Sequence, residues 1–365
     1  MSELGLFLGG DVMTGRGIDQ VMRNPGDPTL HEPWVKSALE YVRLAEQRNG
    51  PIPRNVDPEY VWGDALAVLD EAGTDARIIN LETAITDQGD PWPGKGIHYR
   101  MHPDNVDCIS VAEIDCCVLA NNHVLDWSYD GLTRTLRSLH QAGLGTVGAG
   151  QDLEEATRPA TTDASGRRVV VLALGDPSSG IPTSWSASTD RPGVALAESL
   201  STEVEAISNR VRRESEPGDL VVVSIHWGPN WGYEIPGSHR RFARSLIDNA
   251  GVHVIHGHSS HHALGIEVYR GRPILYGCGD LINDYEGIQG HERYHPDLAA
   301  VYLLDMDPDT GRLVRLQLMP MRMRRFRLEH ASREEVGWLA RVLAREGERL
   351  GTQFSQIGNR LELDW

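Results

Sequence analysis

The segment VIHGHSSHHALG, residues 254–265, begins as a short apolar run and ends in histidines. With His253 just before it, five histidines fall within ten residues. A plain core seldom gathers histidine in this way, because every buried ring nitrogen needs a hydrogen-bond partner. The segment therefore predicts a strand that ends at a polar, functional site.

Five earlier apolar runs also end in polar residues. The six expected strands cover residues 4–9, 76–81, 115–120, 168–174, 220–225 and 252–255. The residues that follow the first five are Asp11; Asn80 and Glu82; Asn122, His123 and Asp126; Asp176; and His226. In open α/β sheets the carboxyl ends of the strands face the ligand crevice. We therefore expect these groups to converge on one polar site.

Amphipathic segments between the expected strands predict helices. One is expected to begin at Asp57-Pro58 and to stop at Gly73, and others cover 130–142 and 238–250. A capping box of Ser332 and Glu335 predicts a C-terminal helix at about 332–350. Closely spaced apolar runs between 264 and 319 indicate hairpins, and 175–193 is a candidate long functional loop. The fold class predicted from these elements is α/β, a mixed sheet with helices outside.

Composition narrows the class of protein. The chain has 365 residues, 40% of them hydrophobic, and a net charge of −17, which argues against nucleic-acid or anionic-membrane binding. Only two lysines occur, and we attribute this scarcity to composition bias. Four cysteines without a CxxC pair indicate free buried thiols. Without a long apolar run or a targeting segment at the start, we expect a cytoplasmic protein with no membrane partner.

The mixture of carboxylate, amide and imidazole groups indicates which ion could bind. These donors suit a hard or borderline divalent cation rather than a thiolate site. His258 and His261 could lie on one side of the tight Gly/Ser turn that the segment contains. We therefore predict a divalent metal site and no organic cofactor.

Longer motifs carry a family resemblance. The order GD, NLE, NNHxLD, HWG, GHxxH and YxxGD, between Leu4 and Tyr285, resembles the CapA family of capsule and poly-γ-glutamate biosynthesis. The resemblance implies a calcineurin-like metallophosphoesterase fold, a sandwich of two mixed sheets flanked by helices. We expect one such domain over residues 1–365.

Departures from the metallophosphoesterase pattern bear on the metal. Met13 stands where that pattern has a ligand histidine, and Asn80-Leu81-Glu82 stands where it has a bridging aspartate. One ion is therefore expected rather than a tight pair, with Ca²⁺ or Mn²⁺ favoured over Zn²⁺. The ligands that the resemblance implies are Asp11, Glu82, Asn122, His226, His258 and His261.

Within the family, a short member without a membrane anchor resembles the lasso-peptide epimerases. That likeness implies a metal-dependent isomerase that inverts the Cα of the C-terminal residue of a ribosomal precursor peptide, tryptophan in the known type. Such a reaction needs two acid/base groups on opposite faces of the Cα. We predict His123 and His295 as this pair, with Asp126 or Asp11 orienting the first and Asp280 or Asp11 the second.

Several alternatives stay open. Trp127 and Trp231 could hold an aromatic substrate side chain, or they could be ordinary core residues. The function could also be that of a metal-dependent phosphoesterase, or of a non-catalytic binding protein in polymer or peptide assembly. His291 to His295 spells the zinc-protease motif HExxH, but that motif requires a helix, and Pro296 disfavours one.

Overall fold

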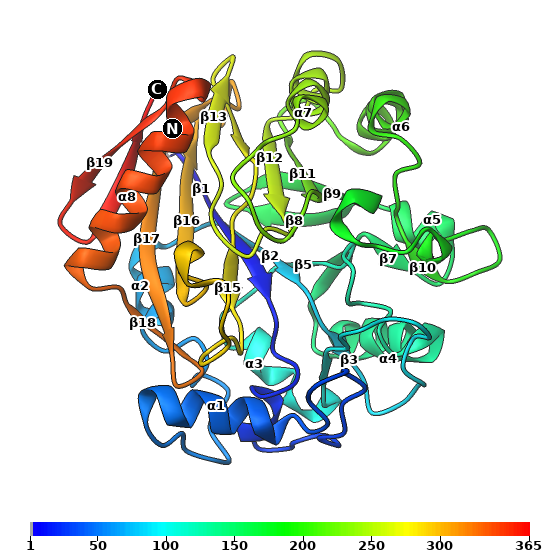
Figure 1. The fold of residues 1–365 in the computed structure, drawn as a ribbon. Coiled ribbons are helices and arrows are strands. Elements are labelled where there is room, and N and C mark those ends of the chain that lie inside the picture. The colour runs from blue at the N-terminus through cyan, green and yellow to red at the C-terminus, as the bar shows by residue number, and fades with distance from the viewer. Residues whose placement is uncertain (1–2) are drawn as a thin grey trace.

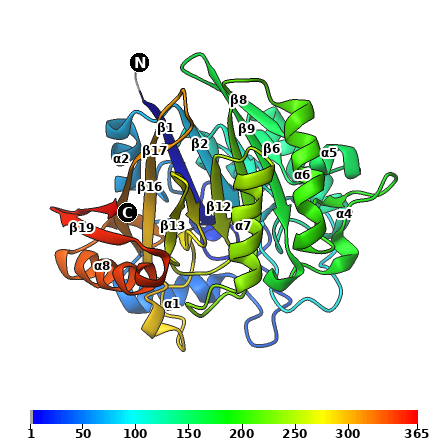
Figure 2. The same ribbon diagram turned by 90° about the horizontal axis from the view of Figure 1, so that it is seen from above.

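Two β-sheets pack face to face, with helices on their outer sides (Figures 1 and 2). The computed structural model describes residues 3–365. The first sheet contains β1 (Leu4–Val12), β2 (Ala76–Leu81), β5 (Cys116–Val118), β6 (Gly145–Val147), β15 (Asp280–Ile282), β16 (Leu298–Met306), β17 (Leu313–Arg324), β18 (Arg327–His330), β19 (Gln353–Ile357) and β20 (Arg360–Asp364). The second contains β8 (Ala160–Ala164), β9 (Arg167–Gly175), β11 (Leu220–His226), β12 (Val254–His258), β13 (Ile266–Tyr269) and β14 (Arg272–Leu275).

Helices and short strand pairs complete the chain. The helices are α1 (Leu39–Asn49), α2 (Asp64–Ala72), α3 (Asp107–Ser110), α4 (Ser128–Gln141), α5 (Leu153–Thr157), α6 (Leu200–Glu214), α7 (Gly237–Asn249) and α8 (Arg333–Gly347). Two small pairs join β3 (Ala84–Ile85) to β4 (Arg100–Met101) and β7 (Ala149–Gly150) to β10 (Gly193–Val194). Ser332 and Glu335 form the predicted capping box at the start of α8, with both reciprocal hydrogen bonds present.

Alternation along the strands divides the core into layers. Leu6 and Leu8 of β1 pack with Val169 and Val222 of the second sheet, so they lie between the sheets. Phe7, which lies between the two leucines in sequence, belongs to the cluster that includes residues of α2 and α4. The outer face of the second sheet is covered by α6 and α7. This is the arrangement of a calcineurin-like sandwich, and the predicted fold class is confirmed.

Parallel pairing brings the polar strand ends together. In the first sheet β1 runs parallel to β2 and β15, with Asp11 opposite Asn80 and Asp280. In the second sheet β11 runs parallel to β12, with His226 opposite His258. The carboxyl ends of both sheets therefore present their polar residues in the same region, as the strand-end pattern predicts.

The structure departs from the sequence expectations in three segments. The helix expected from Asp57 begins only at Asp64, because residues 58–63 form turns that end at Gly63, whose φ is 46°. A Cβ at Gly63 would lie 2.2 Å from the carbonyl oxygen of Leu328, so a contact distant in sequence sets this turn. The 175–193 segment contains two 3₁₀ turns and buries Trp185. The third departure is the β19–β20 hairpin, which the sequence patterns do not predict.

Two expectations drawn from composition can be compared with the described residues. All four cysteines are free and buried, as predicted. Across residues 3–365, none of the helices combines the length and the hydrophobicity needed to cross a bilayer.

Candidate functional site

Asp11 lies at the centre of the converging strand ends. Its carboxylate is fully buried and accepts hydrogen bonds from Asn80 Nδ2 at 2.7 Å and from the Ser259 backbone N–H at 3.3 Å. Burial raises the pKa of Asp11 from 3.8 to about 7, with the Asp280 carboxylate adding to the rise and His261 opposing it. Asp11 is thus an acid/base group that titrates near neutral pH.

Glu82 and two buried amides surround Asp11. Asn80 also donates from Nδ2 to Glu82 at 3.3 Å, and its own oxygen accepts from Asn121 Nδ2 at 3.0 Å. Burial, followed by repulsion from Asp11 and Asp280, raises the pKa of Glu82 well above its ordinary value. Where a metallophosphoesterase has a bridging aspartate, this chain uses an amide as a hydrogen-bond donor to a carboxylate.

A chain of hydrogen bonds fixes the tautomers of three buried histidines. His256 Nε2 lies 2.9 Å from the carbonyl oxygen of Gly9, which can only accept, so this nitrogen carries the proton. Burial lowers the pKa of His256 to about 4, so the ring is neutral and its Nδ1 accepts from the Ser224 hydroxyl at 3.0 Å. Ser224 in turn accepts from His258 Nε2–H at 2.9 Å. His258 Nδ1 then accepts from His226 Nδ1–H at 2.8 Å.

This chain leaves one lone pair at the site, on His226 Nε2. That nitrogen faces the Asn122 Oδ1 oxygen at 3.0 Å and lies 4.0 Å from Glu82 Oε1. Facing acceptors repel each other unless the amide turns its nitrogen to the ring, or a proton or a cation lies between them. Burial lowers the pKa of His226 well below 6.5, which disfavours the proton. The donor set of imidazole, amide oxygen and carboxylate therefore fits a divalent cation.

Possible ligand atoms form two buried groups among the described residues. Asp11, His226 and His258 each bring one atom within 4.8 Å of the others, and so do Asp11, His261 and Asp280. In the hydrogen-bonded arrangement, however, both nitrogens of His258 are occupied, so this ring positions His226 rather than offering a lone pair. His258 becomes available to a metal ion only if its bond to His226 breaks.

His123 and Asp126 form a second acid/base pair beside Glu82. His123 Nδ1 lies 2.6 Å from Asp126 Oδ2, and its Nε2 lies 3.8 Å from Glu82 Oε1. Lys95 Nζ approaches both members of the pair, at 3.1 Å from His123 Nδ1 and 2.7 Å from Asp126 Oδ1. Burial lowers the pKa of His123 to about 4, although Asp126 acts against this. The expected orientation of His123 by Asp126 is therefore present.

His261 differs from its neighbours because it carries a carboxylate partner. Its Nδ1 lies 2.8 Å from Asp280 Oδ1, and its Nε2 lies 3.3 Å from the Tyr285 hydroxyl. Burial alone would lower the pKa of His261, but Asp280 and Asp11 outweigh burial and raise it. Because Asp280 holds Nδ1 and Asn230 Nδ2 lies 2.9 Å from Nε2, neither nitrogen of His261 is free to bind a metal ion in this arrangement.

His295 lies apart from this cluster. Its ring packs 4.2 Å from that of Trp338, and it lines a hollow of about 300 Å³ together with Tyr285 and Arg322. Among residues 3–365 no contact joins His295 to His123 or Asp11, so the structure does not bring the predicted pair together. The HExxH segment forms a single 3₁₀ turn at Glu292–Tyr294, and His295 has a left-handed φ of 50°. It is not the helix that a zinc protease requires.

The two tryptophans expected at the substrate differ in exposure. Trp127 is buried, donates from Nε1 to the Tyr99 carbonyl at 3.2 Å, and lies under the guanidinium of Arg100 at 3.8 Å. Trp231 is half-buried and stacks on His291 at 4.0 Å, with His261 5.3 Å away. Trp231 can therefore form an aromatic wall near the site, whereas Trp127 is packed against residues of the chain itself.

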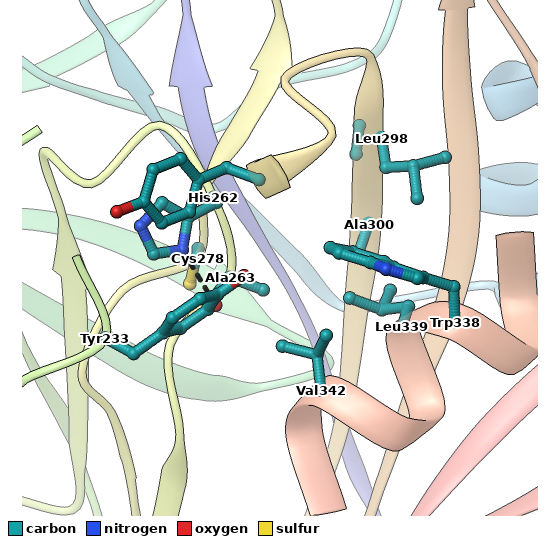
Figure 3. Close-up of a pocket in the computed structure, with 11 residues that line it drawn as sticks. Tyr233, His262, Ala263, Cys278, Leu298, Ala300, Trp338, Leu339 and Val342 are labelled. Atoms are coloured by element: carbon teal, nitrogen blue, oxygen red, sulfur yellow. Dashed lines mark hydrogen bonds between the residues drawn. The ribbon is translucent and has the colours of Figure 1, made fainter. Parts of the chain in front are cut away.

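A small pocket lies beyond this wall (Figure 3). Tyr233, His262 and Cys278 line it on one side and Trp338 and Val342 of α8 on the other. Its volume is about 10 Å³, which is the room that a single water needs. The pocket is too small to hold an indole ring in this conformation.

Several residues of the site are not predicted by the sequence patterns. Lys95 is one of only two lysines and contacts the His123–Asp126 pair, yet the scarcity of lysine was attributed to composition. Asn121 accepts hydrogen bonds from the backbone N–H groups of His123 and Val124, both at 3.1 Å. The only signal for Asn121 was its place beside Asn122, and Ser224 within a buried strand gave none.

Comparisons with known proteins agree with the motif order. The family model for "Bacterial capsule synthesis protein PGA_cap" matches residues 5–285. The chain belongs to this family. A "Probable polyglutamine synthesis accessory protein" of Mycobacterium tuberculosis is 48% identical over 362 residues, which cover 98% of this chain and 95% of that protein. The "PGA biosynthesis protein CapA" of Bacillus subtilis is 28% identical over 305 residues, 83% of this chain and 68% of that protein.

The boundary of the PGA_cap match separates two parts of the structure. The whole buried cluster, from Asp11 to Asp280, lies inside the matched residues. His295, α8 and the β19–β20 hairpin lie outside them. The likeness to the family therefore covers the acid/base cluster and does not extend to the hollow that contains His295.

Proposed function

We propose that this PGA_cap chain is an acid/base enzyme that acts on amide-linked chains of amino acids. The observation that carries the proposal is the buried Asp11, whose pKa of about 7 lies near working pH. It is accompanied by the His261–Asp280 pair and by the His123–Asp126 pair. The names of the M. tuberculosis and B. subtilis relatives refer to polymers of this linkage, which suggests the substrate class.

The finer form of the proposal is epimerisation of the C-terminal residue of a ribosomal precursor peptide. One group removes the Cα proton, and a second group returns a proton to the other face of the carbanion. His123 suits the first role because its lowered pKa leaves Nε2 unprotonated while Asp126 orients Nδ1. Asp11, which is partly protonated near pH 7, suits the second role, and His295 stays a prediction for one of the two roles. Trp231 would lie against an aromatic side chain of the peptide.

A divalent ion held by His226, Asn122 and Glu82 would supply electrophilic stabilisation of the negative charge on a substrate carbonyl oxygen. The residues of the chain then divide the remaining tasks. The chain Gly9–His256–Ser224–His258 holds the His226 ring so that Nε2 faces the site. Asn80 orients Asp11. His123 and then Lys95 outweigh burial and lower the pKa of Asp126.

Deuterium exchange tests this proposal. The protein is incubated in D₂O with a peptide ending in L-Trp, with Mn²⁺, Ca²⁺ or EDTA, and the mass and chirality of the terminal residue are measured. We expect gain of a single deuterium with formation of the D-residue, lost in Asp11→Asn and His123→Ala and retained in His330→Ala, an exposed control. If His123→Ala and His295→Ala both keep full turnover, the pair of histidines has no role as the two bases.

Two other functions predict different results, one in the exchange experiment and one in a separate phosphodiester assay. A non-catalytic accessory protein, which the names of the relatives also suit, would bind the peptide without exchange. A phosphoesterase would release nitrophenol from bis(p-nitrophenyl) phosphate in a chelator-sensitive manner. Met13 and Asn80, in place of metal-binding residues, weigh against the latter.

A further inference from the structure

A groove of about 620 Å³ lies between the N-terminal ends of α6 and α7. These helices run side by side on the outer face of the second sheet (Figure 2). The polar residues that line it include Asp176, Ser178, Ser201, Ser238, His239 and Arg241. The groove is of the size that holds small ligands or a few residues of a peptide.

The first turn of α7 offers unused hydrogen-bond donors. No side chain caps this helix, whose N-cap residue is Pro236. Among residues 3–365, the backbone N–H groups of Gly237, Ser238 and His239 have no acceptor. The guanidinium of Arg241 lies over the same turn, since a Cβ at Gly237 would meet Arg241 Nη1 at 3.2 Å. Free N–H groups and an arginine at a helix N-terminus favour an anion.

The His239 side chain is a second and independent sign of a ligand. Only 6% of this residue is exposed, and its ring stacks on that of Trp227 at 4.5 Å and 2°. Neither ring nitrogen has a hydrogen-bond partner within residues 3–365, although the ring lines the groove. The ring nitrogens can therefore bond to a partner that enters from the groove.

Charge selects the kind of anion. Arg241 and Asp176 contribute one positive and one negative charge to the groove lining. Burial lowers the pKa of His239, although Asp176 acts against this, so the ring is neutral at pH 7. The remaining attraction comes from the helix N-termini, each equivalent to about half a charge. This balance suits a singly charged carboxylate better than a doubly charged phosphate.

Position ties the groove to the buried cluster. His226, at the end of β11, faces the cluster, and the next residue, Trp227, supports His239 on the groove side. Successive residues at a strand end point to opposite faces of a sheet. Ser178 of the groove also accepts from the Gly228 backbone N–H at 3.0 Å. A ligand in the groove therefore lies on the opposite side of the strand end that carries His226.

We propose that this groove binds a carboxylate of an acidic, amide-linked amino-acid chain and so holds the polymer beside the catalytic cluster. The chain enters with its carboxylate at the N–H groups of Ser238 and His239 and at the guanidinium of Arg241. His239 donates to or accepts from the adjoining amide. The substrate class rests on the proposed function, whereas the anion site rests on the groove itself.

Calorimetric titration with pentaglutamate, pentaglutamine and inorganic phosphate tests the groove. We expect pentaglutamate to bind, pentaglutamine to bind at least ~10-fold more weakly, and phosphate to be weaker than pentaglutamate. Arg241→Gln should weaken the binding of pentaglutamate by ~10-fold or more. Arg213 is an exposed arginine on α6, and Arg213→Gln should leave this binding unchanged. Amide shifts of Gly237 to Arg241 in NMR spectra should move on titration.

A second variant, Ser238→Glu, separates loss of binding from loss of folding. A carboxylate in the first turn stabilises a helix, so the melting temperature should hold or rise while pentaglutamate binding is lost. Binding that survives both Arg241→Gln and Ser238→Glu, tighter binding of phosphate, or no pentaglutamate binding overturns the proposal. Asp11→Asn should retain pentaglutamate binding. If the parent protein binds pentaglutamate but shows no deuterium exchange with any peptide, the acid/base function is refuted and the groove proposal still stands.

Discussion

Replacement of Asp11 by asparagine should make the metal-free protein more stable at neutral and alkaline pH. The folded state holds the pKa of Asp11 at about 7, whereas the unfolded chain has the ordinary value of 3.8. An acid whose pKa is raised by folding stabilises the fold fully below pH 3.8, and that contribution is lost as pH rises through 7. At 1.36 kcal/mol per pH unit, the loss amounts to about 4 kcal/mol.

Asparagine preserves most of the local geometry and removes the charge. Its amide oxygen can still accept from Asn80, and the 3.3 Å bond from Ser259 is the one that is lost. Loss of that bond costs about 1 kcal/mol at every pH. The Asp11 charge repels Glu82 and raises the pKa of that carboxyl. The gain in stability from Asp11→Asn therefore comes from both carboxylates together.

Urea unfolding of EDTA-treated protein at several pH values checks this reasoning. The difference in unfolding free energy between Asp11→Asn and the parent should rise by about 1.4 kcal/mol per pH unit between pH 4 and 7 and then level off. A difference that stays constant with pH would refute a raised pKa for Asp11. A difference that falls with rising pH would mean that the fold stabilises the ionised form.

Three further changes have expected outcomes. Lys95→Met removes a cation beside His123, so the pKa of His123 should rise above about 4 in an NMR titration, and an unchanged or lower pKa would contradict the contact. His226→Ala should weaken Mn²⁺ binding by more than ~100-fold in calorimetry, with His330→Ala as the unaffected control; equal affinities would exclude His226 as a ligand. Ser332→Ala removes the α8 cap and should cost about 1 kcal/mol in urea unfolding, with no effect on deuterium exchange.

Local patterns predicted the elements of this chain better than their interactions. The alternating and fully apolar runs marked the central strands to within a few residues, because burial on both faces leaves a continuous hydrophobic signal. The helix expected at Asp57 was misplaced because Gly63 turns against Leu328, a contact that no local pattern contains. The β19–β20 hairpin was missed because half of its residues face solvent.

Local sequence patterns were enough to predict that the polar groups would meet. Strand periodicity and the parallel order of the motifs place Asp11, Asn80, His226 and His258 at carboxyl ends of strands, and in a sandwich those ends share one region. Motif order also identified the family, which the match over residues 5–285 shows.

The chemical role open to each polar group depends instead on contacts that the folded chain makes. The pKa values of Asp11 and His261 follow from burial and from the distances between charges, which spacing along the chain does not contain. The lone pair on His226 follows from hydrogen bonds that join strands of both sheets, beginning at Gly9. Lys95 contacts His123 through a loop whose path is set by packing. Identity of the residues is local information, but their protonation depends on neighbours that are brought together only by the fold.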